Sequence, residues 1–85
     1  MRVDKFLKVS RLIKRREVAK ELCDDGDVWI NGKTAKPSSE IAEGDELKLG
    51  LGRHLLTIRV LSVRPYASKA DAQSMYRIEA DETLA

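Results

Sequence analysis

The sequence predicts an α+β fold, with two short N-terminal helices followed by a small, twisted, mainly antiparallel sheet of four to five strands. Apolar residues recur at three- and four-residue spacing up to about residue 25, a pattern typical of amphipathic helices. From Asp27 onward the spacing changes to two, which is typical of strands. Helices grouped before strands favour the α+β class, and 85 residues are expected to form a single domain, residues 1–85.

The two helices are expected over about residues 3–9 and 14–25, with residues 10–13 as a connector whose apolar side chains pack inward. The apolar stripe of the first helix consists of Val3, Phe6 and Leu7. That of the second consists of Val18, Ala19, Leu22 and Cys23. Gly26 follows, and its tolerance of the left-handed conformation is typical of a helix end.

The first strands are predicted around the tight turn Asn31-Gly32, in which both residues tolerate positive φ. Val28 and Ile30 are expected to face the core and Trp29 the opposite side. Leu47 and Leu49 alternate with polar residues, as in a half-buried strand. Residues 50–54 are expected to form a loop.

A further strand is predicted from the alternation of Leu56, Ile58 and Val60, which Leu61 and Val63 break. This change of phase predicts a β-bulge or strong twist near residue 61. Residues 65–74 form a polar insertion, either a loop or a short helix, and residues 75–79 form the last strand. We expect the acidic C-terminus, about residues 80–85, to be frayed.

The composition excludes two broad classes of protein. Hydrophobic residues make up 42% of the chain and charged residues 35%, which is too apolar for a disordered chain and too charged for a membrane protein. No uninterrupted apolar run approaches the length of a transmembrane helix or a signal peptide. The single cysteine, Cys23, has no partner for a disulfide, which fits a reducing, cytoplasmic compartment.

Charge is distributed unevenly along the chain. Residues 1–20 carry eight basic and two acidic residues, a net charge of +6, whereas residues 21–85 carry eight basic and twelve acidic residues, a net charge of −4. The basic residues of the first segment are Arg2, Lys5, Lys8, Arg11, Lys14, Arg15, Arg16 and Lys20. A solvated helical face would explain some of them, but their clustering favours a polyanion, and specifically a nucleic acid, as partner.

Several of these side chains suit phosphate recognition. Arginine presents a planar fork that matches two phosphate oxygens, and Arg15 and Arg16 lie at a helix start, where free backbone N–H groups also favour anions. Lys33 and Lys36 flank the predicted turn and would extend this surface. Trp29 either packs on the second face of the sheet or offers a ring on which a base can stack.

The residues needed for catalysis or for a metal site are missing. His54 is the only histidine, and Cys23 lies on a buried helical stripe, so neither has an evident catalytic partner. The acidic pairs are typical of solvated turns, and Gly50-Leu51-Gly52 lacks the lysine and the strand-to-helix context of a nucleotide-binding loop. We therefore expect no catalytic residue, no metal and no cofactor.

The first half of the chain, MRVDKFLKVSRLIKRREVAKELCDDGDVWINGKTAKPSSEIAEGDEL, resembles the S-four RNA-binding domain family, which is named for a small-subunit ribosomal protein. The resemblance covers about residues 1–49 and includes the basic start of the second helix, the Val-x-Ile-Asn-Gly turn and Gly44-Asp45. It implies an L-shaped RNA-binding surface and an architectural role for Asn31-Gly32. The RNA contacts it implies are Arg2, Lys8, Arg11, Lys14, Arg15, Arg16 and Lys36.

Two kinds of small family member are similar to this chain: a bacterial ribosome-associated quality-control factor and a small heat-shock protein that binds free large subunits. The first resemblance implies a monomer that binds large-subunit rRNA and peptidyl-tRNA on obstructed large ribosomal subunits. It also implies that the protein stabilises P-site tRNA while a tailing factor on the same particle adds C-terminal alanines. Two other possibilities are a constitutive or assembly-type rRNA-binding protein and, with least support, a compact enzyme.

Overall fold

The two predicted N-terminal helices are present in the computed structural model, which describes residues 1–84. Helix α1 spans Val3–Val9, as predicted, and α2 spans Arg16–Asp24, two residues shorter than predicted at its start. Arg11 has a φ of 62°, which turns the chain, and the Ile13 N–H then donates to the Leu7 carbonyl at 3.0 Å. The connector is therefore longer than its sequence suggested.

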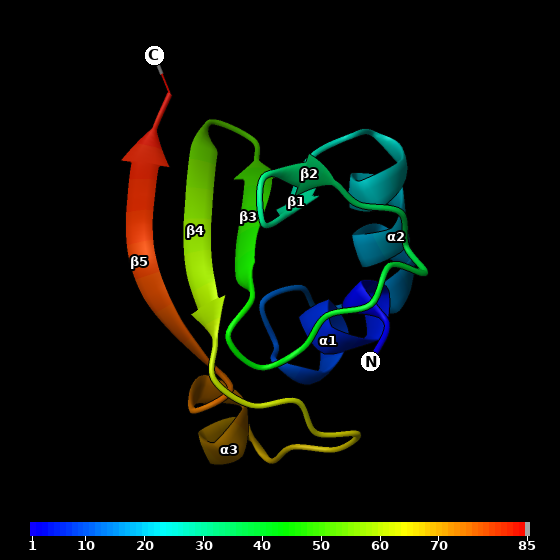
Figure 1. Cartoon of the computed structure of the whole chain (residues 1–85), viewed down its shortest axis with the longest axis vertical. Helices are drawn as coiled ribbons and strands as arrows, with labels where there is room; N and C mark the ends of the chain where they lie inside the picture. The colour runs from blue at the N-terminus through cyan, green and yellow to red at the C-terminus, as the bar shows by residue number, and fades with distance from the viewer. Residues whose placement is uncertain (85) are drawn as a thin grey trace.

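Five antiparallel strands follow in the order β2-β1-β3-β4-β5, which confirms the α+β prediction. Their bounds are Val28–Ile30 (β1), Lys33–Thr34 (β2), Glu46–Leu51 (β3), His54–Val60 (β4) and Tyr76–Thr83 (β5). Figure 1 shows α1 and α2 beside the β1–β3 part of the sheet, while β5 forms the far edge.

Strand pairing separates a core face from a second face of the sheet. Two cross-strand rows point toward the helices: Val28, Leu49 and Leu56, and then Ile30, Leu47 and Ile58. They pack in one apolar cluster with Val3, Phe6 and Leu7 of α1 and Ala19 and Cys23 of α2. The row on the second face consists of Trp29, Lys48, Thr57 and Ala80, all half-buried. Trp29 therefore points away from the core, as predicted.

The turn between β1 and β2 is the expected one, with φ of 50° at Asn31 and 84° at Gly32. The Asn31 side chain donates from Nδ2 to Asp45 Oδ1 at 3.1 Å and accepts from the Glu46 N–H at 2.9 Å. These bonds fasten the β1–β2 turn to the start of β3. Asn31 is thus architectural.

One prediction about the sheet was wrong. Residues 50–54 are not a loop, because β3 continues to Leu51 and pairs with His54, so the turn contains only Gly52 and Arg53. The strand pattern is irregular near residue 61, as predicted, because the Leu61 and Ser62 N–H groups both donate to the Met75 carbonyl, at 2.8 and 3.2 Å. A β-bulge that was not predicted lies on β5. Thr57 pairs with Ala80 and Ile58 pairs with Ile78, which leaves Glu79 without a paired residue on β4. The change of phase after Val60 also coincides with the end of β4.

The polar insertion contains a short helix, α3 (Lys69–Gln73), with Ser68 as its N-cap. Strand β5 continues to Thr83, four residues beyond the predicted end, because residues 80–83 pair with β4. Fraying from residue 80 was therefore wrong for these residues, and Ala85 lies outside the described residues. Within residues 1–84, no helix has the length and apolarity needed to cross a membrane.

Candidate nucleic-acid interface

A buried carboxylate organises two of the predicted RNA-binding arginines. The Asp4 side chain is completely shielded from solvent at the start of α1. Arg2 donates to it from Nε and Nη2, both at 3.2 Å, and Arg16 donates from Nη2 at 3.3 Å. The Lys5 backbone N–H adds a bond of 2.8 Å. Asp4 thereby joins the residue before α1 to the first residue of α2.

Two opposing effects act on the pKa of Asp4. Burial raises this pKa, but the hydrogen bonds from Arg16 and the Lys5 N–H and the charges of Arg16 and Arg2 outweigh burial, so the pKa lies below its ordinary value of 3.8. Asp4 is therefore ionised at neutral pH and holds both guanidinium groups in place. The side chains of Arg2 and Arg16 remain 46% and 40% exposed. Each thus keeps donors for a phosphate.

The segment after β2 lies against the same end of α1. The Val3 N–H donates to the Ser39 carbonyl at 2.8 Å, and the Asp4 N–H donates to the Pro37 carbonyl at 3.4 Å. Lys36 is exposed and directly precedes Pro37, and its N–H donates to Ser39 Oγ at 2.9 Å. These contacts bring Lys36 to the same end of α1 as the two arginines. We call Arg2, Asp4, Arg16 and Lys36 the Asp4 cluster.

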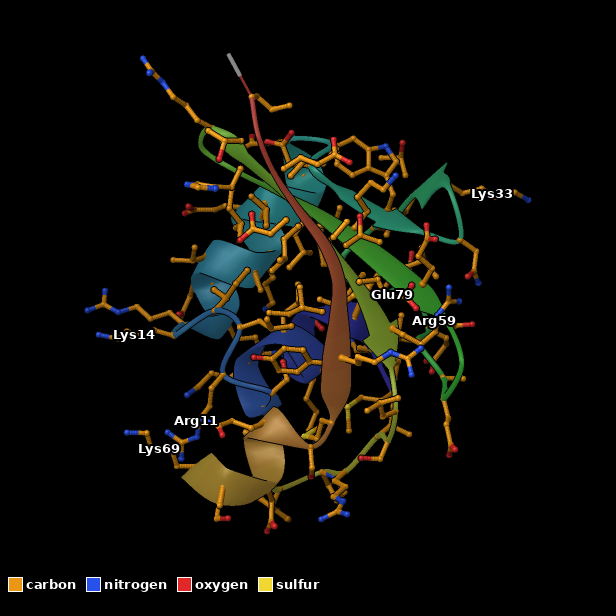
Figure 2. The ribbon with its side chains drawn as sticks, turned by 90° about the vertical axis from the view of Figure 1, so that its left-hand side faces the viewer. Arg11, Lys14, Lys33, Arg59, Lys69 and Glu79 are labelled. Carbon is orange, nitrogen blue, oxygen red and sulfur yellow. The ribbon has the colours of Figure 1, made fainter. Side chains whose placement is uncertain are left out.

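Other predicted contact residues lie along α1 and the connector. Lys8 is exposed and Lys5 half-buried on α1, while Arg11 and Lys14 are exposed in the connector. Buried Ile13 anchors this connector to the core. Figure 2 shows Arg11 and Lys14 projecting from the same side of the molecule.

The start of α2 differs from the prediction, because Lys14 lies before the helix and Arg15 is its N-cap. Arg15 has an extended backbone, and no side chain of the described residues caps the helix there. The first N–H groups of α2 therefore have no side-chain acceptor, which preserves the anion-attracting field expected at this end.

The structure does not group Lys33 with the connector residues. Lys33 lies on β2 and projects from the opposite side of the molecule to Lys14 and Arg11 (Figure 2). The predicted residues thus form an Asp4 cluster, a basic strip along α1 and the connector, and a separate lysine on the edge of the sheet.

The two arginines of the sheet, Arg59 and Arg77, are paired with an acid. Arg59 Nη2 lies 2.9 Å from Glu79 Oε1, and Arg77 Nη2 lies 3.1 Å from Glu79 Oε2; Figure 2 shows Arg59 and Glu79 together. The hydrogen bonds from Arg59 and Arg77 lower the pKa of Glu79, and the bond to Glu79 raises the pKa of Arg59. Within residues 1–84, by contrast, no acid lies within ion-pair distance of Lys5, Lys8, Arg11, Lys14, Arg15 or Lys20.

Cys23 and His54 were the two residues considered for catalysis. Cys23 is buried, and burial, followed by the charges of Asp4 and Asp24, raises the pKa of its thiol to about 11. His54 Nδ1 lies 3.4 Å from Asp81 Oδ1 on the neighbouring strand. Among the described residues, no group of His, Cys, Asp or Glu could hold a metal ion.

Sequence reasoning missed the role of Asp4. An acidic residue in the first turn of a helix is usually explained by the helix dipole and by solvent exposure. The available signal was its position, since Asp4 lies between Val3 and the Phe6-Leu7 pair on the stripe that was predicted to be buried. A buried charge needs a partner of opposite charge, and the same basic segment contains two candidates, Arg2 and Arg16.

Comparison with known proteins supports the resemblance seen in the sequence. The S4 domain family matches residues 1–47. The chain is 50% identical over 84 residues to the RQC P-site tRNA stabilizing factor of Bacillus subtilis, covering 99% of this chain and 98% of that protein. It is 44% identical over 84 residues to the protein of the same name from Halalkalibacterium halodurans, covering 99% of this chain and 96% of that protein.

A solved structure extends the similarity to the fold. Vibrio cholerae heat shock protein 15, described as trimeric, superposes with a TM-score of 0.86 at 32% sequence identity, covering 94% of this chain and 82% of that chain. The fold, with its N-terminal helices and antiparallel sheet, and the sequence matches thus indicate the same family. On this evidence the chain belongs to the S4 domain family.

Proposed function

We propose that this protein binds structured RNA through its N-terminal helices and the segment after β2. The observation that carries the proposal is the exposed, mostly unpaired basic surface of residues 1–20, which Asp4 organises at one end. The proposed contacts are Arg2, Lys5, Lys8, Arg11, Lys14, Arg15, Arg16, Lys36 and, on the edge of the sheet, Lys33. Arginines held in place by a buried carboxylate lose little conformational entropy on binding phosphate.

The proposed RNA targets are large-subunit rRNA and peptidyl-tRNA on obstructed large ribosomal subunits in the cytoplasm. The relatives' name, RQC P-site tRNA stabilizing factor, supports this choice at 44–50% identity over nearly the full length. In this role the protein docks as a monomer, stabilises P-site tRNA and supports the addition of C-terminal alanines by a tailing factor on the same particle. It performs no chemistry and acts by holding RNA in position.

The test uses cells that lack the protein, complemented either with the wild-type chain or with the Arg2→Ala/Arg16→Ala double variant. We expect the wild type to sediment with large subunits that carry peptidyl-tRNA, and mass spectrometry to find alanine tails on stalled chains. The double variant should leave the particles, and tailing should fall sharply. Circular dichroism of the purified variant controls for loss of the fold.

Normal tailing without the protein would reject the quality-control role while leaving RNA binding open. The second candidate is then a factor that recycles free large subunits, as the resemblance to the heat-shock-type family members implies. The superposition on Vibrio cholerae heat shock protein 15 favours this alternative. Sedimentation with all large subunits at unit stoichiometry would instead favour a constitutive ribosomal protein.

A further inference from the structure

An exposed tyrosine projects from a part of the chain that the S4 domain match does not include. The match ends at residue 47, whereas Tyr66 lies between β4 and α3. Its side chain is 86% exposed, the largest exposed fraction among the exposed large hydrophobic residues of the described chain. Such exposure of an aromatic ring contributes nothing to the core, and rings of this kind stack on unpaired bases.

The tyrosine is attached to a well-anchored element. Ser68 caps α3 by accepting from the Asp71 N–H at 3.1 Å, and Ala72 and Met75 are buried. Lys69 begins this helix and is exposed. Three residues of chain span at most about 10–11 Å. The Tyr66 and Lys69 backbones are therefore no farther apart than the length of one to two nucleotides.

Two basic residues, Arg64 and Lys69, flank Tyr66 in the sequence. Arg64 precedes it and meets Asp71 only at 4.0 Å, with both side chains about half exposed. Lys69 has no ion pair within the described residues. Figure 2 shows Lys69 and Arg11 at the same corner of the molecule, and in Figure 1 α3 lies below the α1 end of the fold.

We propose that Tyr66, Lys69 and Arg11 bind an unpaired nucleotide of an RNA, with the tyrosine ring stacking on the base and the two cations contacting flanking phosphates. The inference rests on the proposed RNA-binding function and adds a second contact region. Aromatic rings beside cations suit single-stranded RNA, because every base offers a face to stack on and every linkage a charge. This region lies at the far end of α1 from the Asp4 cluster.

Fluorescence anisotropy of the full chain with two RNA probes of equal length tests the stacking. One probe is a blunt-ended duplex, and the other is a duplex with fewer base pairs and a single-stranded tail. Tyr66→Ala should weaken binding of the tailed probe by at least about fivefold and leave the paired probe unchanged. Tyr66→Phe keeps the ring and should bind both probes as the wild type does.

The phosphate contact proposed for Lys69 is tested through the dependence of RNA affinity on salt concentration. Lys69→Gln should reduce the log–log salt slope for the tailed probe by about 0.7, as expected for one single-strand phosphate contact. Arg53→Gln is the matched control, since it removes one charge from the β3–β4 turn, at the opposite end of the sheet from α3 (Figure 1). It should leave the slope unchanged.

The outcomes separate this inference from the proposed function. A wild-type chain that binds neither probe overturns both. If the wild type binds both probes, but Tyr66→Ala and Lys69→Gln leave the tailed probe unaffected or weaken the two probes equally, only the second contact region is overturned. If Tyr66 were shielded from solvent on the ribosomal particle by a ribosomal protein instead of by RNA, the second contact region would also be overturned.

Discussion

The arginines of the helical region and those of the sheet are paired with acids in different ways. On the sheet, Glu79 pairs with both Arg59 and Arg77 on the surface. In the helical region, most cations have no acid within ion-pair distance among the described residues, and the acid that does pair, Asp4, is buried. The overall charge of +2 hides this difference.

The position of the carboxylate decides what the arginines can do. An exposed acid such as Glu79 competes with any external anion for its arginines. Buried Asp4 holds Arg2 and Arg16 from the inner side and leaves part of each guanidinium open to solvent. Residue counts therefore indicate a charged surface, whereas pairing indicates which part of that surface is available to bind RNA.

The strongest test of this contrast is Asp4→Asn. The substitution removes the charge that holds two arginines, and we expect it to destabilise the fold by about 2–3 kcal/mol, less than for a fully buried ion pair because the arginines are partly exposed. Urea denaturation measures the loss, and RNA affinity should fall with it. A variant as stable as the wild type would show that Asp4 does not organise the cluster.

The same carboxylate predicts a dependence of stability on pH. Since the pKa of Asp4 is lower in the folded state, its contribution is present above the unfolded value of about 3.8 and is lost as pH falls through the lower, folded pKa. Denaturation midpoints measured between pH 6 and pH 2 should fall more steeply for the wild type than for Asp4→Asn. Parallel curves would contradict the assignment.

Single arginine variants should have an intermediate effect. Arg2→Ala and Arg16→Ala each remove a fork able to bind phosphate, and we expect each to weaken RNA binding by about 1–2 kcal/mol. Arg16→Ala should also lower stability slightly, because Asp4 loses one donor. Isothermal titration with tRNA measures binding, and Arg77→Ala on the sheet is the matched control.

The number of phosphates contacted sets the salt dependence. If the wild-type surface neutralises four or five phosphates, the log–log slope of affinity against salt should be about −3 to −4. Anisotropy titrations from 50 to 300 mM salt give this slope. A slope near zero would remove the electrostatic basis of the proposed function.

The smallest effect is expected on the sheet. Glu79→Gln removes the acid that pairs with Arg77 and the nearer of the two acids that pair with Arg59, so RNA binding should become slightly tighter and its salt slope slightly steeper, with little change in Tm. The same titrations detect this change. An unchanged slope would mean that pairing with Glu79 is not what keeps the sheet from binding RNA.

Local patterns predicted much of the fold. The apolar periodicity predicted the bounds of α1 and the phase of β4, and the Asn31-Gly32 pair predicted the turn, because these features depend on residues close in sequence. The start of α2 was misplaced because it depends on the left-handed Arg11 and on the bond from Ile13 to Leu7, which no local propensity reveals.

Long-range pairing explains the remaining differences. The bulge at Glu79 and the extension of β5 to Thr83 follow from the register against β4. This register cannot be inferred from the sequence of either strand alone. Acidic residues 81 and 82 suggested a frayed end, yet backbone pairing holds them in the sheet. At the candidate interface, the basic residues were predictable from composition, but the cluster required knowing that Asp4 is buried.

The bulge on β5 also affects how copies of this protein behave toward one another. β5 is the last strand in the sheet order, so one of its edges has no neighbouring strand among residues 1–84. Such edges promote aggregation by pairing between molecules, and bulges and charged side chains oppose it. Glu79 interrupts the ladder, and Arg77, Asp81 and Glu82 place charges along the strand. The bulge and these charges therefore disfavour edge-to-edge pairing of β5 between crowded molecules, which would extend their sheets into a continuous fibre.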